Sequence, residues 1–464
     1  MDDFPAQSQV QWITREAAER FAPAVIGPRT WWNGALPVES LAIRSASAAL
    51  TAAHAFLGER RFALDTRRLA GAFASIRHLR VDGAAPEPYD AASGFFQCRD
   101  GWVRTHANYP HHRDALAGAL GLGELAAALR ERAAADVEEL AFATGGLAVR
   151  VRGRAEWRAT LPAEGRAGAA GPETPWIALH PRTGSPRAVD RPAGDRRDAG
   201  SRLAGLRVLD LTRVIAGPTG TKFLAALGAD VLRVDPPHRP ELLTQHLDTD
   251  DGKRSAEADL READALNRVR ALATEADVVL TGYRPGALAR FGLDAAAPLE
   301  TRPGLAVVEL DAWGGCPEPW RGRRGFDSLV QAASGIADLY GTAAGDEEAA
   351  RDDTVTGHGT SMRDEAWNPG ALPVQALDHA TGYGAAAAAL TLLPTGGSAR
   401  LSLARTAEEL FSLPPLRPGP GPAGEAAPEL VEVGSPHGRL TRVAPLIGEP
   451  RAPGRYGADV LTWV

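Results

Sequence analysis

The stretch LAGLRVLDLTRVIAGP, residues 203–218, decides the fold of the larger part of the chain. Its apolar run at 207–211 is short and ends in a polar turn, which is typical of a buried strand in a parallel sheet. Similar runs, separated by helical stretches at 220–227 and 263–276, follow at 230–234, 277–280 and 305–310. This alternation predicts βαβ units and an α/β fold with a Rossmann-like parallel sheet. Right-handed crossovers would bring the carboxyl ends of the strands, and any ligand site, to one edge.

The first part of the chain has a different, α+β pattern. Residues 95–107, FFQCRDGWVRTHA, predict a hairpin that turns at Asp100-Gly101, and helical stretches follow from Pro110 and at 134–141. Residues 183–201, TGSPRAVDRPAGDRRDAGS, hold Pro, Gly and charges without apolar periodicity, as an interdomain linker does. We therefore expect a small α+β domain over 1–182, this linker, and a Rossmann-like domain over 202–464.

An internal repeat connects the two halves. WNGALPVESL, residues 32–41, matches WNPGALPVQAL, residues 367–377, and an Ala-rich helical stretch follows each copy. Each copy then leads to a strand–helix pattern, RFALDTRRLAGAFAS at 61–75 and ARLSLARTAEELFSL at 399–413. Two copies do not make a solenoid, so we interpret the repeat as duplication of one structural element.

Composition excludes several classes of protein. With 51 Lys and Arg against 58 Asp and Glu, the formal net charge of −7 offers no broad basic surface to nucleic acid or to an anionic membrane. Two cysteines, Cys98 and Cys316, make neither a disulfide framework nor a cysteine-based zinc site. The first residues lack the pattern of a signal peptide, and the longest apolar run, 385–393, is too short for a bilayer. We expect a soluble cytoplasmic protein with neither nucleic-acid nor membrane partners.

Four further segments extend the opening stretch into an ordered series: LGADVLRVDPP (227–237), DDGKRSAEADL (250–260), ADVVLTGYRPGALARFGLD (276–294) and RRGFDSLVQAASG (323–335). This series resembles the large domain of the family III CoA-transferases, the CaiB/BaiF family. The glycine fingerprints of dinucleotide and P-loop sites are absent, so nicotinamide chemistry has no support. Residues 89–116 and 153–161 resemble the small domain of the family. In this chain that part precedes the large domain, an order that suggests a fusion remnant.

The resemblance implies that residues 202–464 bind CoA and catalyse the reaction. The nucleophile of the family is an Asp in a short D-x-x-x-G segment, which Asp378 to Gly382 match here. A carboxylate suits the task because its mixed anhydride with an acyl group is as reactive as a thioester, so the thiolate can return and leave an aspartyl-CoA thioester. Helix-start amides near Asp378 would hold it ionised, and Gly382 would let backbone or substrate approach. The alternative is that Asp378 only caps a helix; Ala42, its counterpart in the first repeat copy, favours the nucleophile.

A second carboxylate, Asp327, precedes a helical run. The resemblance implies a supporting catalytic role near the site, and capping of that helix is an equal alternative. Beside it, Phe326 stands where racemases of the family have a His that exchanges an α-proton with the Asp. A Phe side chain can neither donate nor accept a proton, so epimerisation by that two-base route is disfavoured.

The implied ligand is coenzyme A, bound as an acyl-CoA substrate, and the reaction needs no metal. The phosphates of CoA attract arginines, and its adenine needs an apolar or aromatic wall. Gly282 departs from the Asn often found at its place, and each arginine could alternatively be a solvated surface residue. The positions that match CoA contacts of the family are Val214, Ile215, Ala216, Arg261, Gly282, Tyr283, Arg290 and Arg324.

Two groups of polar residues favour a structural interpretation over a functional one. His106, His111 and His112 lie around Tyr109, but without a carboxylate or thiol partner their spacing predicts a polar helix start and not a metal site. The acidic stretch 345–353, GDEEAARDD, is expected to be a solvated loop, with a border of the acyl pocket as the alternative.

Three functional hypotheses stay open at this point. The first is a CoA-transferase that moves CoA from an acyl-CoA donor to a carboxylic acid acceptor. The second is another acyl-CoA enzyme on the same scaffold, such as a racemase, isomerase or hydrolase, and the third is a non-catalytic CoA-binding protein. A homodimer is expected because family members form interlaced dimers, although a chain with elements of two copies could make those contacts internally.

Overall fold

A seven-stranded sheet is the centre of the computed structural model, which describes residues 15–32, 34–87, 89–121, 125–161, 175–182, 203–342, 367–414 and 427–464. The strand order is β10-β9-β8-β11-β12-β13-β7, and only β7 (Ala178–Pro181) runs antiparallel to its neighbour. Counted from β8, the parallel strands have the order 3-2-1-4-5-6 of doubly wound folds, with the switch point between β8 and β11. The parallel strands are β8 (Arg207–Leu211), β9 (Asp230–Asp235), β10 (Arg254–Glu257), β11 (Val278–Thr281), β12 (Ala306–Asp311) and β13 (Gly397–Ser402).

The strands predicted from apolar runs are confirmed to within one residue at each end as β8, β9, β11 and β12. The strand of the second repeat copy is β13. Two strands of the seven-stranded sheet were not predicted. β10 has the sequence RSAE, which contains no apolar run, and β7 lies before the predicted linker, in the part assigned to the other domain.

Helices cover both faces of this sheet. Val208 and Val308 pack with residues of α9 (Ala216–Ala226) and α15 (Ala376–Leu392), whereas Leu209 and Val307 pack with α11 (Ala263–Glu275). Residues near α12 (Ala296–Thr301) join the second of these cores. Neighbouring strand residues point to opposite faces and both faces are buried, so β11 and most of β12 are continuous apolar runs. β8 and β9 also bury charged residues, Asp210, Arg233 and Asp235.

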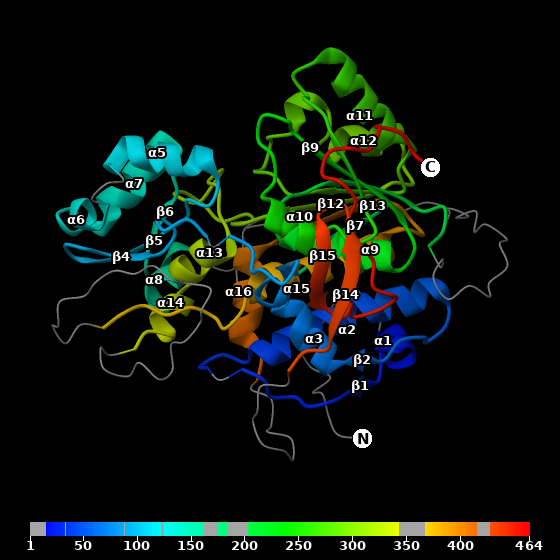
Figure 1. The fold of residues 1–464 in the computed structure, drawn as a ribbon, viewed down its shortest axis with the longest axis horizontal. Coiled ribbons are helices and arrows are strands. Elements are labelled where there is room, and N and C mark those ends of the chain that lie inside the picture. Colours follow the sequence, from blue (N-terminus) through cyan, green and yellow to red (C-terminus); the bar gives the residue numbers. More distant parts are fainter. Residues whose placement is uncertain are drawn as a thin grey trace.

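The two copies of the repeat lie against each other. α2 (Val38–Leu57), the helix of the first copy, packs along α15, the helix of the second, as Figure 1 shows below the sheet. α15 is therefore enclosed by the sheet, α9 and α2, and every residue in it except Thr391 is buried. Its Ala-rich sequence suits this position, because small side chains let three neighbours approach closely.

A separate lobe, coloured cyan in Figure 1, projects to one side. Its strands pair antiparallel, and the predicted hairpin at Asp100-Gly101 is confirmed as β4 and β5. The lobe has its own core and rests on α13 (Asp327–Ser334). It consists of β4 (Phe95–Cys98), β5 (Gly101–Thr105), α5 (Pro110–Leu120), α6 (Leu125–Arg130), α7 (Ala134–Thr144) and β6 (Ala148–Arg150).

The contacts divide the chain differently from the predicted small domain over 1–182. α2 packs on α15 and β7 extends the large sheet, so both belong to the larger body, and the lobe core spans only 92–148. Local sequence pattern identifies a helix or strand but not the layer against which it packs. The predicted linker at 183–201 and the acidic stretch at 345–353 lie outside the described residues.

No described helix is long and apolar enough to cross a membrane.

The remaining elements are short or lie outside the main sheet. β14 and β15 form a small sheet with β3, and β1 pairs with β2. These elements are α1 (Arg15–Phe21), β1 (Val25–Ile26), β2 (Leu64–Asp65), α3 (Thr66–Phe73), α4 (Ser75–His78), β3 (Arg80–Val81), α8 (Arg154–Thr160), α10 (Leu243–Thr249), η1 (Ala289–Phe291), α14 (Ile336–Leu339), α16 (Leu403–Ser412), β14 (Leu430–Ser435) and β15 (Gly438–Val443).

Two glycines set the distance between α9 and α15. A Cβ on Gly382 would lie 2.3 Å from the carbonyl oxygen of Ala216, and one on Gly220 would lie 2.7 Å from the carbonyl oxygen of Gly382. Both distances are too short for any side chain, and the obstacle in each case is backbone. The expectation that Gly382 permits a close backbone approach is confirmed. Since residues four apart share a helix face, the same contact directs Asp378 toward the start of α9.

Gly382→Ala should therefore force the two helices apart and lower the free energy of unfolding by about 1–3 kcal/mol. Gly118→Ala is the matched control, because Gly118 lies in α5 with open space around its missing Cβ. There the change should be neutral or stabilising by about 0.5–1 kcal/mol, since Ala has the higher helix propensity. Denaturant unfolding of both variants measures the difference; equal effects would contradict the packing constraint.

Candidate functional site

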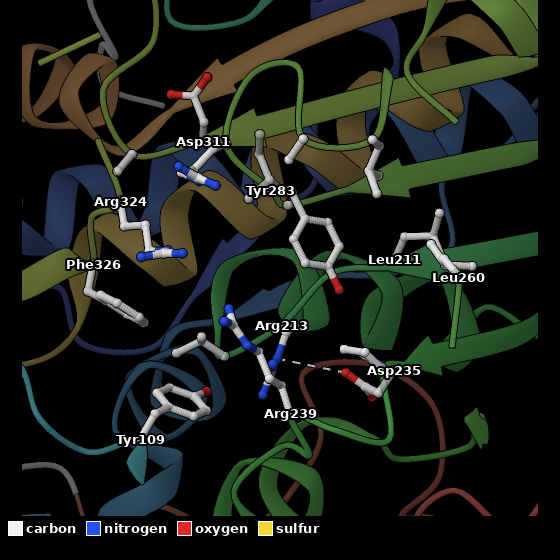
Figure 2. A pocket seen from close by; sticks show the side chains of 18 of the residues that line it. Tyr109, Leu211, Arg213, Asp235, Arg239, Leu260, Tyr283, Asp311, Arg324 and Phe326 are labelled. Carbon is white, nitrogen blue, oxygen red and sulfur yellow. Dashed lines mark ion pairs between the residues drawn. The ribbon is translucent and has the colours of Figure 1, made fainter. Parts of the chain in front are cut away.

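A cavity of ≈ 340 Å³ opens at the switch point, beyond the carboxyl ends of β8 and β11. Its walls combine strand ends, the loop after each strand and residues of the lobe (Figure 2). A second cavity, of ≈ 520 Å³, lies on the lobe side and is lined by Ile215 and Asp327. The other predicted site residues all line the first cavity: Val214, Ala216, Arg261, Gly282, Tyr283, Arg290, Arg324 and Asp378.

The loop after β8 is strained where it meets the cavity. Val214 has a φ of 67°, a left-handed conformation that a β-branched residue rarely adopts and that costs of order 1–3 kcal/mol. Its N–H donates to Glu241 Oε2 at 2.8 Å, and the hydroxyl of Tyr109 donates to Glu241 Oε1. Burial would raise the pKa of Glu241, but Arg233 and Arg213 outweigh burial and hold the pKa below its ordinary value. One buried carboxylate thus fixes both the loop and the lobe.

Positive charge gathers on the cavity wall. Arg213 lies 3.6 Å from Glu241, but among the described residues Arg239, Arg284 and Arg324 have no carboxylate within 4.0 Å. Burial, with the charges of Arg284 and Arg239, lowers the pKa of Arg324. Such mutually repelling guanidinium groups need an anionic ligand.

The predicted arginines differ in their surroundings. Arg261 forms an exposed ion pair with Asp259, and Arg290 lies over the ring of Phe291 at 4.5 Å. Among the described residues, Arg290 and Arg324 have no carboxylate within 4.0 Å, and Arg324 is the one of the three whose pKa is lowered by Arg239 and Arg284. Sequence reasoning missed Arg239 and Arg284, because the resemblance carried no arginine at those positions; the Arg-Pro-Gly turn at 284–286, directly after a strand end, was the available signal.

The two candidate carboxylates are buried side by side. Asp378 is the third residue of α15, and its N–H donates to Asp327 Oδ2 at 2.9 Å. Asp327 Oδ1 accepts from Gln331 Nε2 at 2.5 Å, and Gln331 Oε1 accepts from the N–H of Leu372 at 2.8 Å. Asp327 therefore caps α15, not the helix α13 that it begins. Helix-start amides near Asp378 were expected to hold it ionised, but one of them, the N–H of Asp378 itself, donates to Asp327. The side chain of Gln375, the N-cap residue, makes no cap bond within the described residues.

Burial and mutual repulsion control the charge of this pair. Burial raises the pKa of Asp378 well above its ordinary value, and the neighbouring charge of Asp327 raises it further. Burial also raises the pKa of Asp327, although its hydrogen bonds to Gln331 and Asp378 partly oppose the rise. The pair thus resists carrying two negative charges, as carboxylate pairs at catalytic sites do.

Phe326, the chain neighbour of Asp327, contacts the histidines of the lobe. Its ring stacks on His106, with centroids 3.7 Å apart and planes inclined by 9°. Burial lowers the pKa of His106 to about 3 and that of His112 to about 2, so both rings are neutral. Among the described residues no three His, Cys, Asp or Glu side chains are grouped closely enough to hold a metal ion.

The family model for CoA-transferase family III matches residues 203–406. This region, called the family III region below, is similar to CoA-transferase family III. The acetyl-coenzyme A transferase nodX of Hypoxylon pulicicidum is 39% identical over 150 residues, 32% of this chain and 25% of that protein. The succinate–glutarate CoA-transferase of Agrobacterium fabrum is 32% identical over 157 residues, 30% and 39% of the two chains. A solved CAIB/BAIF family protein from Brucella suis is 26% identical with a TM-score of 0.37, over 46% of this chain and 56% of that one.

The chain therefore spans between 25% and 56% of the lengths of these relatives. The family III region contains both carboxylates and every predicted CoA-binding residue. Tyr109, His111 and His112, which also line the first cavity, lie in the lobe, before the matched region.

Within the family III region, Asp378→Asn should stabilise the fold at alkaline pH. Because the folded protein holds the Asp378 proton above the ordinary carboxyl pKa of about 3.9, stability is lost as pH rises through the raised pKa. The amide of the variant does not ionise, so the variant avoids this loss of stability. The loss is about 1.4 kcal/mol of unfolding free energy for each unit by which folding raises the pKa. Melting temperatures should therefore diverge from wild type at pH 8 and converge near pH 4.

Asp327→Asn is the contrasting variant. An amide offers one oxygen where Asp327 accepts from two donors, so this variant should lose roughly 1–3 kcal/mol at neutral pH. If Asp378→Asn were destabilising at pH 8 in the same way, the repulsion between the two carboxylates would be refuted.

Proposed function

We propose that the protein is a CoA-transferase that moves CoA from an acyl-CoA donor to a carboxylic acid acceptor, with Asp378 as the nucleophile. One observation carries the proposal: Asp378 is the carboxylate that lines both described cavities. A group in that position can reach a thioester whose CoA part occupies one cavity and whose acyl part occupies the other. The family III region supports a CoA substrate.

The first cavity suits the nucleotide end of CoA. Arg239, Arg284 and Arg324 supply guanidinium groups that pair with phosphate oxygens, and Tyr283 supplies an aromatic wall. Val214, in its left-handed conformation, and Ala216, the first residue of α9, both line this cavity. CoA binding should relieve the repulsion that lowers the pKa of Arg324.

In the donor half-reaction, the Asp378 carboxylate attacks the thioester carbonyl carbon. A C–O bond forms, the C–S bond breaks, and CoA leaves as the thiolate with the bonding electron pair. The thiolate then attacks the Asp378 carbonyl of the mixed anhydride. The new C–S bond leaves an aspartyl-CoA thioester, and the donor acid departs as its carboxylate.

In the acceptor half-reaction, the acceptor carboxylate attacks the aspartyl thioester and displaces the thiolate. The thiolate attacks the acyl carbonyl of the second anhydride, which yields the new acyl-CoA and returns Asp378 as a carboxylate. No proton is consumed across the cycle. Asp378 must begin ionised, and a site that disfavours its charge makes the carboxylate more nucleophilic once the proton is lost.

Phe326 argues against the racemase alternative, because a phenyl ring stacked on the neutral His106 offers no proton for exchange at that position. A hydrolase and a non-catalytic CoA-binding protein are separated from the transferase by experiment. The homodimer expected from the family is likewise a proposal, and light scattering would measure its mass.

Asp378→Asn should abolish exchange, by about 10³-fold or more, because an amide is a far poorer nucleophile, while CoA binding persists. The assay incubates wild type with a panel of acyl-CoAs, with and without carboxylic acids, and measures new acyl-CoA. Asp327→Asn should keep measurable activity, and Asp264→Asn, an exposed residue of α11, should match wild type.

Three results would contradict the proposal. Full exchange by Asp378→Asn would exclude it as the nucleophile. Conversion that does not depend on an acceptor would indicate an isomerase, racemase or hydrolase. CoA binding without turnover of any donor would favour the binding protein.

A further inference from the structure

The second cavity shares Asp378 and Phe326 with the first cavity, but none of the arginines Arg239, Arg284 and Arg324 lines it. Its walls come from the segment 76–109, from α10 and from the first turn of α13. Most of its lining residues carry polar or charged side chains. These are Arg77, Arg80, Glu87, Tyr89, Asp90, Ser93, Arg104, His106, Asn108, Tyr109, Thr244, Gln245, Asp327, Ser328, Gln375 and Asp378.

We propose that this cavity binds the acyl group and selects acyl groups that carry a second carboxylate, such as those of dicarboxylic acids. The inference rests on the proposed function, since it assigns the substrate class of that site. A site for a hydrocarbon chain would be lined mainly by aliphatic and aromatic side chains. A long saturated acyl group would strip water from the polar wall without replacing its hydrogen bonds.

The charges of the cavity favour an anion. Arg80 Nη1 donates to the carbonyl oxygens of Arg77 and Leu79 at 2.7 and 2.8 Å, so groups without net charge hold the guanidinium in place. Arg104, 9% exposed, also lines the cavity; it lies over the ring of Phe95 at 4.9 Å, and its charge acts to lower the pKa of Asp327. Guanidinium groups bind carboxylates in a planar, two-bonded geometry.

Among the described residues no carboxylate lies within 4.0 Å of the Arg80 guanidinium, whose hydrogen bonds go to carbonyl oxygens. Asp90 lies 3.8 Å from Arg113 and accepts from the N–H of Ala92, so its charge is directed to those groups. Glu87 is exposed. Asp327 and Asp378 are the pair whose burial and repulsion oppose full ionisation.

Two buried polar groups in the wall point to a polar ligand. Gln245, 2% exposed, has no hydrogen-bond partner for Oε1, and His106, 7% exposed, has none for Nδ1, among the described residues. An unsatisfied buried group is costly, and a ligand with polar atoms removes that cost. The neutral imidazole can donate one hydrogen bond, and rotation of the Gln245 amide presents either its oxygen or its nitrogen to the ligand.

The test measures isotope exchange between each acyl-CoA and its own labelled free acid, with the wild-type full chain. Succinyl-, glutaryl- and adipyl-CoA are compared with butyryl-, pentanoyl- and hexanoyl-CoA of equal chain length. For the preferred length, kcat/KM of the dicarboxylic member should exceed that of its partner by about tenfold or more, the discrimination that one charged hydrogen bond supplies. Equal or faster exchange of the monocarboxylic member at every length would overturn the inference but leave the proposed function standing. No Asp378-dependent exchange with either series would overturn both.

Two variants of the second cavity distinguish a loss of acyl-group recognition from a loss of folded protein. Arg80→Gln and Gln245→Leu should each lower the dicarboxylic-to-monocarboxylic ratio, by about tenfold for Arg80→Gln. The ratio is the readout, because a partly unfolded enzyme loses both activities equally. Arg67→Gln, on the exposed face of α3, is the matched control and should keep the wild-type ratio. An unchanged ratio in both cavity variants would contradict the assignment.

Discussion

The close approach of α9 and α15 is the constraint on which the site depends. At Gly382 and Gly220 the two helices meet backbone to backbone, so no side chain sets a larger spacing. α2 presses on the other side of α15, which fixes the helix between a repeat partner and the sheet. Asp378, one turn before Gly382, is thereby held at the start of α9 and at the switch point between β8 and β11. The duplicated element thus serves the site as packing support in one copy and as carrier of the carboxylate in the other.

The same arrangement lowers the stability of the folded protein. Two buried carboxylates repel each other, Val214 is held in a left-handed conformation, and Arg239, Arg284 and Arg324 have no carboxylate partner in the part of the chain that the structure describes. Hydrogen bonds compensate in part: Asp327 caps α15, and Glu241 accepts from the Val214 loop and from Tyr109 of the lobe. Strained backbone and buried charges that the surrounding structure holds in place are typical of sites that bind charged ligands.

Much of this arrangement follows from the sequence, and the limits have physical causes. Apolar runs predicted β8, β9, β11 and β12, because burial on both faces favours apolar residues in a parallel strand, and they missed β10, whose sequence has no such run. The resemblance carried Asp378, Asp327 and the CoA contacts to residues that do line the two cavities. A local sequence pattern does not say which other helix or strand each element packs against. The packing of α2 on α15, the addition of β7 to the large sheet and the capping of α15 by Asp327 all join residues far apart in the chain. The same holds for Glu241 and for the stacking of Phe326 on His106, where the His cluster was expected to be only a polar helix start.

The central claim is that Asp378 carries first the acyl group and then CoA, and trapping of that intermediate tests it most directly. Wild-type protein is incubated with a turned-over acyl-CoA, treated with hydroxylamine, digested and mapped by mass spectrometry. The account predicts one modified peptide, which contains an aspartyl hydroxamate at Asp378, and no such product in protein that received free CoA in place of acyl-CoA. A hydroxamate on any other residue, or its absence while exchange proceeds, would contradict the account.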